Sequence, residues 1–228
     1  MKPIPIIYEN DEILIINKPA GVAVQGGAGI SHPLDKELPL QTGHPVHLVH
    51  RLDRGTAGLM ILAKSPRAAA EWTKLIGGSA VRKEYTAVCI GAMECRRGTL
   101  RAAVVQHGAE RAAVTHYEAV REASVRTGAP EPDGEIILTE LRLHLETGRM
   151  HQIRIHLANI GRPILGDDSH GDFRLNKLLR KCCGAKNLML AATRLTLPIG
   201  GTDRTFSIEP PGYMSLSRLA GAAAQADA

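Results

Sequence analysis

A single aspartate stands in a segment whose composition suits chemistry. Asp53 lies in His50-Arg51-Leu52-Asp53-Arg54, and the glycine-bounded stretch Gly55-Thr56-Ala57-Gly58 follows it. A carboxylate held among two arginines and a histidine, on a loop that precedes an apolar stretch, is a candidate for a reactive site. Taken alone, such a cluster is more often a set of surface salt bridges. The segment therefore indicates a reactive carboxylate only if other parts of the chain support it.

Two further segments carry side chains that could act beside this carboxylate. Arg82-Lys83-Glu84-Tyr85 opens an expected strand, where a tyrosine is usually half-buried with its hydroxyl at the rim. Arg149, His151 and Arg154 lie at the start of an expected helix, where they could bind phosphate or simply be solvated. Each segment is weak evidence by itself.

The elements that would position these residues follow from the spacing of apolar side chains. Residues 140 to 146 alternate in the manner of a strand, and residues 150 to 160 change to helical spacing. Ser65-Pro66 is a helix start, with Trp72, Leu75 and Ile76 on its apolar face and Gly77-Gly78 at its end. Short apolar runs predict further strands over residues 12–17, 58–63, 83–91 and 112–120. The sequence therefore predicts an α+β fold with a mixed, mainly antiparallel sheet flanked by helices and loops.

Three stretches are predicted to lack regular structure. Residues 25–45 and 122–134 are rich in Gly and Pro and are expected to be surface loops. Residues 220–228 are expected to be a frayed tail.

Composition limits the class of protein. The chain has 228 residues and an ordinary balance of apolar and charged residues, with 28 Lys and Arg against 23 Asp and Glu. This modest positive charge favours a polyanionic partner such as RNA or DNA. Neither a membrane-spanning run nor a signal peptide is recognisable, so a cytoplasmic location is expected. The four cysteines have no spacing typical of zinc sites, and reduced thiols are predicted.

Together the reactive segments resemble one family, the RluA-type pseudouridine synthases. The segment around Asp53 resembles that family's catalytic motif, and Lys83-Glu84-Tyr85 resembles its tyrosine motif. The resemblance covers about residues 5 to 210, and its four motifs occur in the family's order. The matching segments are Asn17 to Gly21, His50 to Gly58, Lys83 to Tyr85, and Thr147 to Arg154 continued by Gly161 to Asp167.

The resemblance implies an isomerase that converts a uridine in RNA to pseudouridine without a cofactor or a metal. Asp53, Tyr85 and Arg154 would be the catalytic residues: Asp53 as nucleophile or base, Arg154 as its ionic partner, and Tyr85 stacking on the base or moving a proton. RNA binding and base flipping would fall to His50, Arg51, Arg54, Arg149, His151 and Gln152. An RNA-facing rim is expected from Lys18, Arg54, Arg149, Arg162, Arg174 and Lys177, although each could equally be a solvated side chain.

The substrate is suggested by a smaller resemblance. His170 to Lys177 and Val114 to Tyr117 resemble the tRNA pseudouridine synthase C branch, which implies a tRNA uridine, number 65 in that branch. Arg54-Gly55-Thr56 departs from the Arg-Pro-Thr of that branch, so a uridine of 23S ribosomal RNA is the alternative. The resemblance also implies one catalytic domain over residues 1–215, a C-terminal tail over 216–228, and no separate N-terminal RNA-binding domain. The sequence does not predict the oligomeric state, and a monomer is the default expectation.

Two rival interpretations belong to other classes. His44, His47 and His50 have the spacing of metal ligands on a helix, but Pro45 interrupts that helix and the neighbouring residues favour extended chain. A catalytically silent RNA-binding protein would share the basic surface, but it would not need Asp53, Tyr85 and Arg154 together. The sequence thus favours the enzyme over both.

Overall fold

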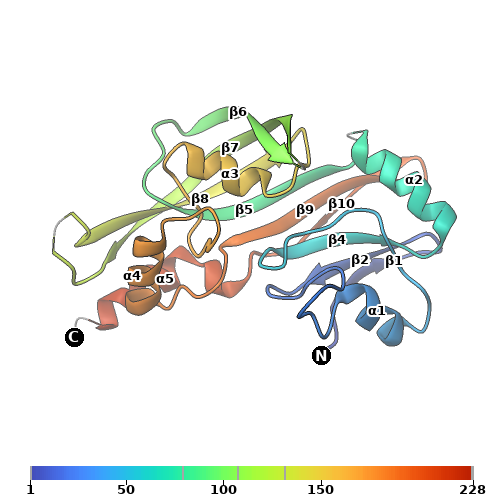
Figure 1. The fold of residues 1–228 in the computed structure, drawn as a ribbon, viewed down its shortest axis with the longest axis horizontal. Coiled ribbons are helices and arrows are strands. Elements are labelled where there is room, and N and C mark those ends of the chain that lie inside the picture. The colour runs from blue at the N-terminus through green and yellow to red at the C-terminus, as the bar shows by residue number, and fades with distance from the viewer. Residues whose placement is uncertain (1, 79, 107, 131, 227–228) are drawn as a thin grey trace. The chain divides into compact units, whose positions relative to one another are not determined.

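The computed structural model describes residues 2–78, 80–106, 108–130 and 132–226 (Figure 1). The chain divides into two compact units. Unit 1 comprises Met1–Lys83 and Ala191–Glu209, and unit 2 comprises Glu84–Leu190 and Pro210–Ala228. Each unit combines two separate segments of the chain, so residues that are distant in sequence meet within it.

The strands of unit 1 follow the order β1-β2-β4-β9-β10. All neighbours are antiparallel except β4 and β9, which pair in parallel where Ala57 and Gly58 face Ala191 and Ala192. The short strand β3 pairs with the far end of β4. The bounds are β1 Ile6–Glu9, β2 Ile13–Lys18, β3 His47–Leu48, β4 Ala57–Ala63, β9 Leu190–Ile199 and β10 Thr202–Ser207.

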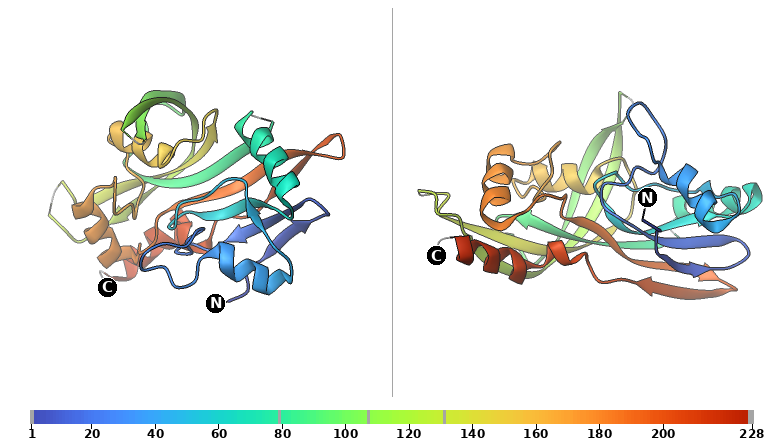
Figure 2. Two further views of the ribbon diagram at one scale, coloured as in Figure 1. Left: turned by 45° about the vertical axis from the view of Figure 1, so that its right-hand side comes forward. Right: turned by 90° about the horizontal axis from the view of Figure 1, so that it is seen from below.

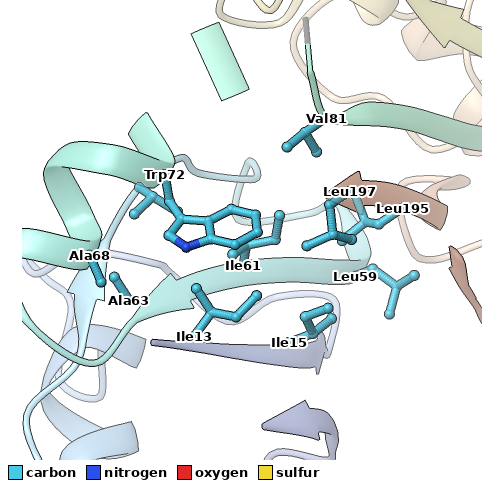
Figure 3. Close-up of a cluster of buried hydrophobic side chains, with 11 residues drawn as sticks. Ile13, Ile15, Leu59, Ile61, Ala63, Ala68, Trp72, Val81, Leu195 and Leu197 are labelled. Atoms are coloured by element: carbon cyan, nitrogen blue, oxygen red, sulfur yellow. The ribbon is translucent and has the colours of Figure 1, made fainter. Parts of the chain in front are cut away.

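One face of this sheet packs against helix α2 (Pro66–Gly77). The Trp72 side chain lies over the sheet beside Ile61, within a cluster of buried apolar side chains (Figure 3), and its Nε1 donates to Glu12 Oε2 at 3.4 Å. The Ser65 hydroxyl accepts a hydrogen bond from the Ala68 N–H at 3.2 Å, which confirms the predicted start of the helix. Burying such a cluster is the main source of stability for this unit.

Helix α1 (Leu34–Thr42) corrects the prediction that residues 25–45 are a loop. Pro39 lies inside this helix, where a proline removes one backbone hydrogen bond, and this is why the sequence argued against a helix there. Leu34 and Leu38 are four residues apart and fully buried on one side, which offsets that loss. Gly43 ends the helix in the left-handed conformation.

The strands of unit 2 form an antiparallel sheet in the order β5-β8-β7-β6. Leu141 and Leu143 on β8 are buried, as the alternation of that segment predicts. Strand β6 was not predicted, and β7 continues to Arg126, so the expected loop over 122–134 is shorter than its composition suggests. The bounds are β5 Arg82–Ile90, β6 Arg97–Gln106, β7 Ala109–Arg126 and β8 Glu135–Leu145.

Unit 2 also holds helices α3 (Gln152–Asn159), α4 (Phe173–Cys183) and α5 (Leu216–Ala226), and a short 3-10 turn at Gly212–Met214. The α3 helix was predicted, whereas α4 was not. The two helices α4 and α5 lie side by side (Figures 1 and 2). Residues 216–226, predicted as a tail, are helical because Leu216 and Leu219 are buried.

The described chain is therefore α+β with mixed, mainly antiparallel strand pairing, as the sequence predicts. None of its described helices combines the length and the apolar character needed to cross a bilayer.

Candidate active site

Asp53 lies in unit 1, in the loop over residues 49–56 that joins β3 to β4 (the Asp53 loop). This loop leads directly into the fully buried strand β4. Leu52 is buried beneath the loop, whereas Asp53 is half-buried. The Thr56 N–H donates to the Asp53 carbonyl oxygen at 3.1 Å, which closes a turn. The carboxylate is therefore carried by a short, tightly turned segment at the end of a rigid strand, as a catalytic group needs.

The turn that follows β2 holds this loop in place. The Lys18 ammonium donates to three carbonyl oxygens, those of Pro19 at 3.0 Å, Val22 at 2.9 Å and Arg54 at 3.2 Å. In addition, the Gly21 N–H donates to the Arg54 carbonyl at 2.8 Å, and Arg54 Nε donates to the Gly21 carbonyl at 3.0 Å. Lys18 is fully buried, so its predicted place on an RNA-facing rim is wrong. Its role is to join two loops.

Burial also changes the titration of Lys18. Desolvation lowers the pKa of Lys18 to about 8, and the negative charge of Asp53 acts in the opposite direction on that pKa. At neutral pH the ammonium group is therefore still charged.

Replacing Lys18 by Met tests this environment through stability. The folded pKa lies below the ordinary value of 10.5, so the unfolded chain binds more protons than the folded chain between pH 8 and 10.5. We expect the free energy of unfolding of the wild type, relative to Lys18→Met, to rise as the pH increases through this window. Urea unfolding of both proteins at pH 7 and pH 10 measures this difference in the free energy of unfolding. Lys74→Met is the matched control, because the Lys74 side chain is exposed. A constant difference between wild type and Lys18→Met would contradict the lowered pKa.

His50 stabilises β4 from the same loop. Its Nε2 accepts a hydrogen bond from the Ile61 N–H at 2.9 Å, beyond the point where β3 stops pairing with β4. Desolvation, with Lys83 as a second cause, lowers the pKa of His50 to about 3, so the ring is neutral and Nε2 is free of a proton. This arrangement gives His50 a structural role, and the RNA contact expected of it stays a prediction.

The two arginines of the loop differ from His50 in being exposed. Arg51 reaches Gln25, with Nη1 donating to Oε1 at 3.1 Å, and the guanidinium of Arg54 is bound to the Gly21 carbonyl. Both positions suit a contact with phosphate, which stays a prediction.

In unit 2, Gln152 fixes the start of α3. Its amide oxygen accepts from Thr147 Oγ1 at 2.8 Å and from the Arg149 N–H at 3.0 Å. Its amide nitrogen donates to the Val114 carbonyl and to Thr115 Oγ1, each at 3.0 Å. Because Gln152 is buried and all four of these bonds go to protein groups, it positions the helix, and the RNA contact expected of it stays a prediction.

His151 precedes this helix in a left-handed conformation, with φ at 55°. It is the one non-glycine residue with positive φ among the described residues. Such a conformation is uncommon outside glycine and is found preferentially at functional sites. The ring Nδ1 lies 2.9 Å from Nε2 of His170. The backbone of His151 is therefore held where its ring meets a second loop.

Arg154 projects from α3 into a buried ion pair. Its Nε donates to Asp167 Oδ2 at 2.8 Å and its Nη2 donates to Oδ1 at 2.7 Å. The two side chains are 9% and 1% exposed. Desolvation acts to raise the pKa of Asp167, but hydrogen bonds from Arg154 and from the His170 and Ser169 N–H groups outweigh it and lower the pKa to about 2. The pair is therefore ionised throughout the neutral range.

Tyr85 lies on the face of the unit 2 sheet that α3 covers. It is opposite Leu143 on β8, which is opposite Tyr117 on β7, so the three side chains share a face. Two residues along β7, Thr115 is on the same face and its hydroxyl lies 2.9 Å from Nδ1 of His156 on α3. The structure thus brings Tyr85 and the helix that carries Arg154 to one side of one sheet.

The other predicted rim residues are mostly exposed, and several of them also have protein partners. Arg149, Arg174 and Lys177 are exposed, but Arg149 Nε donates to the Ala112 carbonyl at 3.4 Å and Arg174 pairs with Asp133. Arg162 Nη1 donates to the Gly161 carbonyl at 3.0 Å. Asp167 is the functional candidate that the sequence did not single out, although Gly166-Asp167 closes the third motif. No local pattern indicates that an aspartate thirteen positions later pairs with Arg154.

Two of the three histidines of the rival metal-site interpretation have other partners. His44 Nε2 lies 3.2 Å from Glu9 Oε1, and His50 accepts from the Ile61 N–H. Among the residues that the structure describes, no group of three or more His, Cys, Asp or Glu side chains could hold a metal ion.

Comparison with known proteins identifies the family. The RNA pseudouridylate synthase family model matches residues 12–159. Ribosomal large subunit pseudouridine synthase D of Salmonella typhimurium is 36% identical over 184 residues, and that of Escherichia coli K12 is 35% identical over the same length. Each match covers 74% of this chain and 53% of the relative, so the chain spans about half the length of these curated relatives.

Two solved human structures share the fold. RNA Pseudouridylate Synthase Domain Containing 1 has a TM-score of 0.73 at 21% identity, covering 92% of this chain and 87% of its own. RNA Pseudouridylate Synthase Domain Containing 4 has a TM-score of 0.72 at 24% identity, covering 96% and 93%. These likenesses confirm the α+β pseudouridine synthase fold. Because the family model matches more than half of its residues, this chain belongs to the RNA pseudouridylate synthase family.

Proposed function

We propose that this chain isomerises a uridine in RNA to pseudouridine, with Asp53, Tyr85 and Arg154 as its catalytic residues. The observation that carries the proposal is the family match over residues 12–159, which contains all three. The anchored Asp53 loop and the oriented Arg154 guanidinium support it, because both give a reactive group a fixed direction.

The proposed reaction is an exchange of bonds at the ribose. The bond from C1′ to N1 of the uracil breaks, the base turns, and C1′ bonds to C5. The proton of C5 leaves and N1 carries a proton in the product, so no electrons are gained or lost. The residues of the chain must therefore expose the base, stabilise charge and move a proton, and we expect no cofactor requirement.

Each catalytic residue has a proposed task. Asp53 attacks the ribose or removes a proton, and either task requires an ionised carboxylate. Arg154 stabilises that charged form through its planar guanidinium. Tyr85 stacks on the uracil or accepts a proton from the reacting nucleotide.

The exposed arginines are proposed to hold the extruded nucleotide. A base within folded RNA must leave its stack before chemistry can occur at C1′. Arg51 and Arg54 lie on either side of Asp53 in the same loop, and Arg149 and His151 precede α3. Contacts from these arginines to phosphate would weaken as the salt concentration rises.

For the substrate we propose 23S ribosomal RNA ahead of tRNA. The curated relatives are named as ribosomal large subunit enzymes. The resemblance of His170 to Lys177 to the tRNA branch is the argument for a tRNA uridine. Within that segment, however, Asn176 is buried and Asp172 caps α4 by accepting from the Leu175 N–H, so part of the segment serves the fold. A monomeric state and a cytoplasmic location stay predictions.

The test is to incubate purified protein with unmodified 23S RNA and tRNA transcripts, without added cofactor, and to map pseudouridine chemically in each. One modified uridine in 23S RNA is the expected result. Modification of tRNA alone would keep the reaction and overturn the substrate. No pseudouridine in either, nor in total RNA from a strain lacking the gene, would favour a non-catalytic RNA-binding protein.

A further inference from the structure

The loop over residues 166–172 holds the guanidinium of Arg154. We propose that Asp167 is a positioning residue of the reaction, whose buried carboxylate sets the direction in which Arg154 acts; this rests on the function proposed above. Nothing in the family comparison assigns such a role to Asp167.

The geometry of the pair fixes the whole guanidinium. Asp167 binds Nε and Nη2, the two nitrogens on one edge of the planar group. Because the group is rigid, fixing that edge also fixes the direction of Nη1. A lone arginine side chain has several rotatable bonds, and a single-point contact would leave its plane free to turn.

The carboxylate is itself held firmly. Besides accepting from Arg154, Asp167 Oδ1 accepts from the Ser169 N–H at 2.9 Å and from the His170 N–H at 3.0 Å. The Asp167 carbonyl accepts from the Gly171 N–H at 3.1 Å and from Asn176 Nδ2 at 3.0 Å. The acid is thus bound through both its side chain and its backbone.

Two glycines let the loop approach so closely. A Cβ atom at Gly171 would lie 2.2 Å from the Asp167 carbonyl oxygen, and one at Gly166 would lie 2.0 Å from the Asn187 carbonyl oxygen. Asn176 spans the loop, since its Oδ1 accepts from the Gly166 N–H at 2.9 Å. The backbone is therefore shaped around Asp167 and cannot shift without breaking several contacts.

The loop meets α3 at a second point. His170 contacts His151, the residue that immediately precedes α3. Two contacts between one loop and one helix prevent the loop from rotating about the ion pair. An ion pair kept only for stability would not need this precision, because buried pairs often contribute little net stability.

Asp167→Asn distinguishes a role in positioning Arg154 from a role in stability alone. The variant keeps the shape but places an NH2 group against an arginine N–H, so Arg154 loses one bond and its fixed direction. We expect the single-turnover rate of pseudouridine formation at saturating enzyme to fall about 100-fold, with the RNA dissociation constant changed less than about twofold. Asp168→Asn is the matched control, since Asp168 is the next residue of the loop and its exposed carboxylate pairs with Arg180 on the surface.

Stability is measured on the same samples by urea unfolding. A rate for Asp167→Asn equal to that of the wild type, or a loss no greater than its loss of folded protein, would overturn the proposal. Absence of pseudouridine with the wild type would instead refute the proposed function. If Asp167→Asn does not fold, Asp167→Glu keeps the charge but displaces the fork, and a folded variant with about 10-fold lower rate is expected. A wild-type rate in Asp167→Glu, or failure of both variants to fold, would leave Asp167 a structural residue only.

Discussion

Asp53→Asn is expected to lower the rate of pseudouridine formation by at least about 10⁴-fold, the scale seen when a reacting group is removed. The amide has the size of the carboxylate but cannot attack the ribose or accept a proton at neutral pH. The backbone of the loop should keep its shape, because its bonds to Lys18, Gly21 and Thr56 use backbone atoms that the substitution leaves in place. RNA affinity should therefore change little.

The measurement is a single-turnover assay at saturating enzyme, together with a filter-binding titration of the same RNA. Asp11→Asn is the control, because Asp11 is exposed in the turn between β1 and β2. A rate for Asp53→Asn above about one per cent of wild type, with the control unaffected, would refute the catalytic assignment.

Gly58→Ala is expected to reduce the free energy of unfolding by more than about 4 kcal/mol, a large share of the stability of an ordinary domain. Gly58 has φ at 110°, which an L residue rarely adopts, and a Cβ there would lie 2.2 Å from the Ala192 carbonyl oxygen. That oxygen belongs to β9, which pairs with β4 at this point. The added atom must therefore separate the two strands or rearrange the end of β4 that carries the Asp53 loop.

A matched substitution predicts the opposite sign. Gly77 lies in α2, and a Cβ added there would have no atom within 4 Å, so Gly77→Ala should increase stability by about 0.5–1 kcal/mol. Urea unfolding followed by circular dichroism measures both variants. Equal midpoints for Gly58→Ala and the wild type would show that the strands tolerate the extra carbon.

The sequence predicts those elements whose pattern is set by one face of burial. β8 alternates in sequence because only one of its faces packs on the core, and α2 begins where Ser65 caps it. By contrast, α1 was missed because Pro39 argues against a helix, and only its tertiary contacts favour one. The end of the chain was predicted to be a tail because short alanine-rich sequence has no local signal for the buried contacts of Leu216 and Leu219.

In the candidate site, the sequence identified most of the candidate residues, but it did not predict their burial or their hydrogen-bond partners. The motif around Asp53 and the position of Tyr85 on a strand could be read from the chain. The burial of a basic or polar side chain could not be predicted in this way. Lys18 and Gln152 are buried because hydrogen-bond acceptors and donors from distant segments converge on them. Asp167 was missed for the same reason, since its meaning comes from Arg154 and from two backbone N–H groups that no spacing rule relates to it.

The strand order of unit 1 has a consequence for synthesis on the ribosome. Strand β4 is apolar along its whole length, yet its parallel neighbour β9 begins more than a hundred residues later in the chain. During translation, β4 therefore leaves the ribosome before β9 does, and one edge of β4 lacks that neighbour until β9 has left the exit tunnel. An apolar strand with an open edge is prone to pair with other chains. The nascent protein is accordingly most vulnerable to aggregation in the interval before β9 appears, and slow translation between these strands would lengthen it.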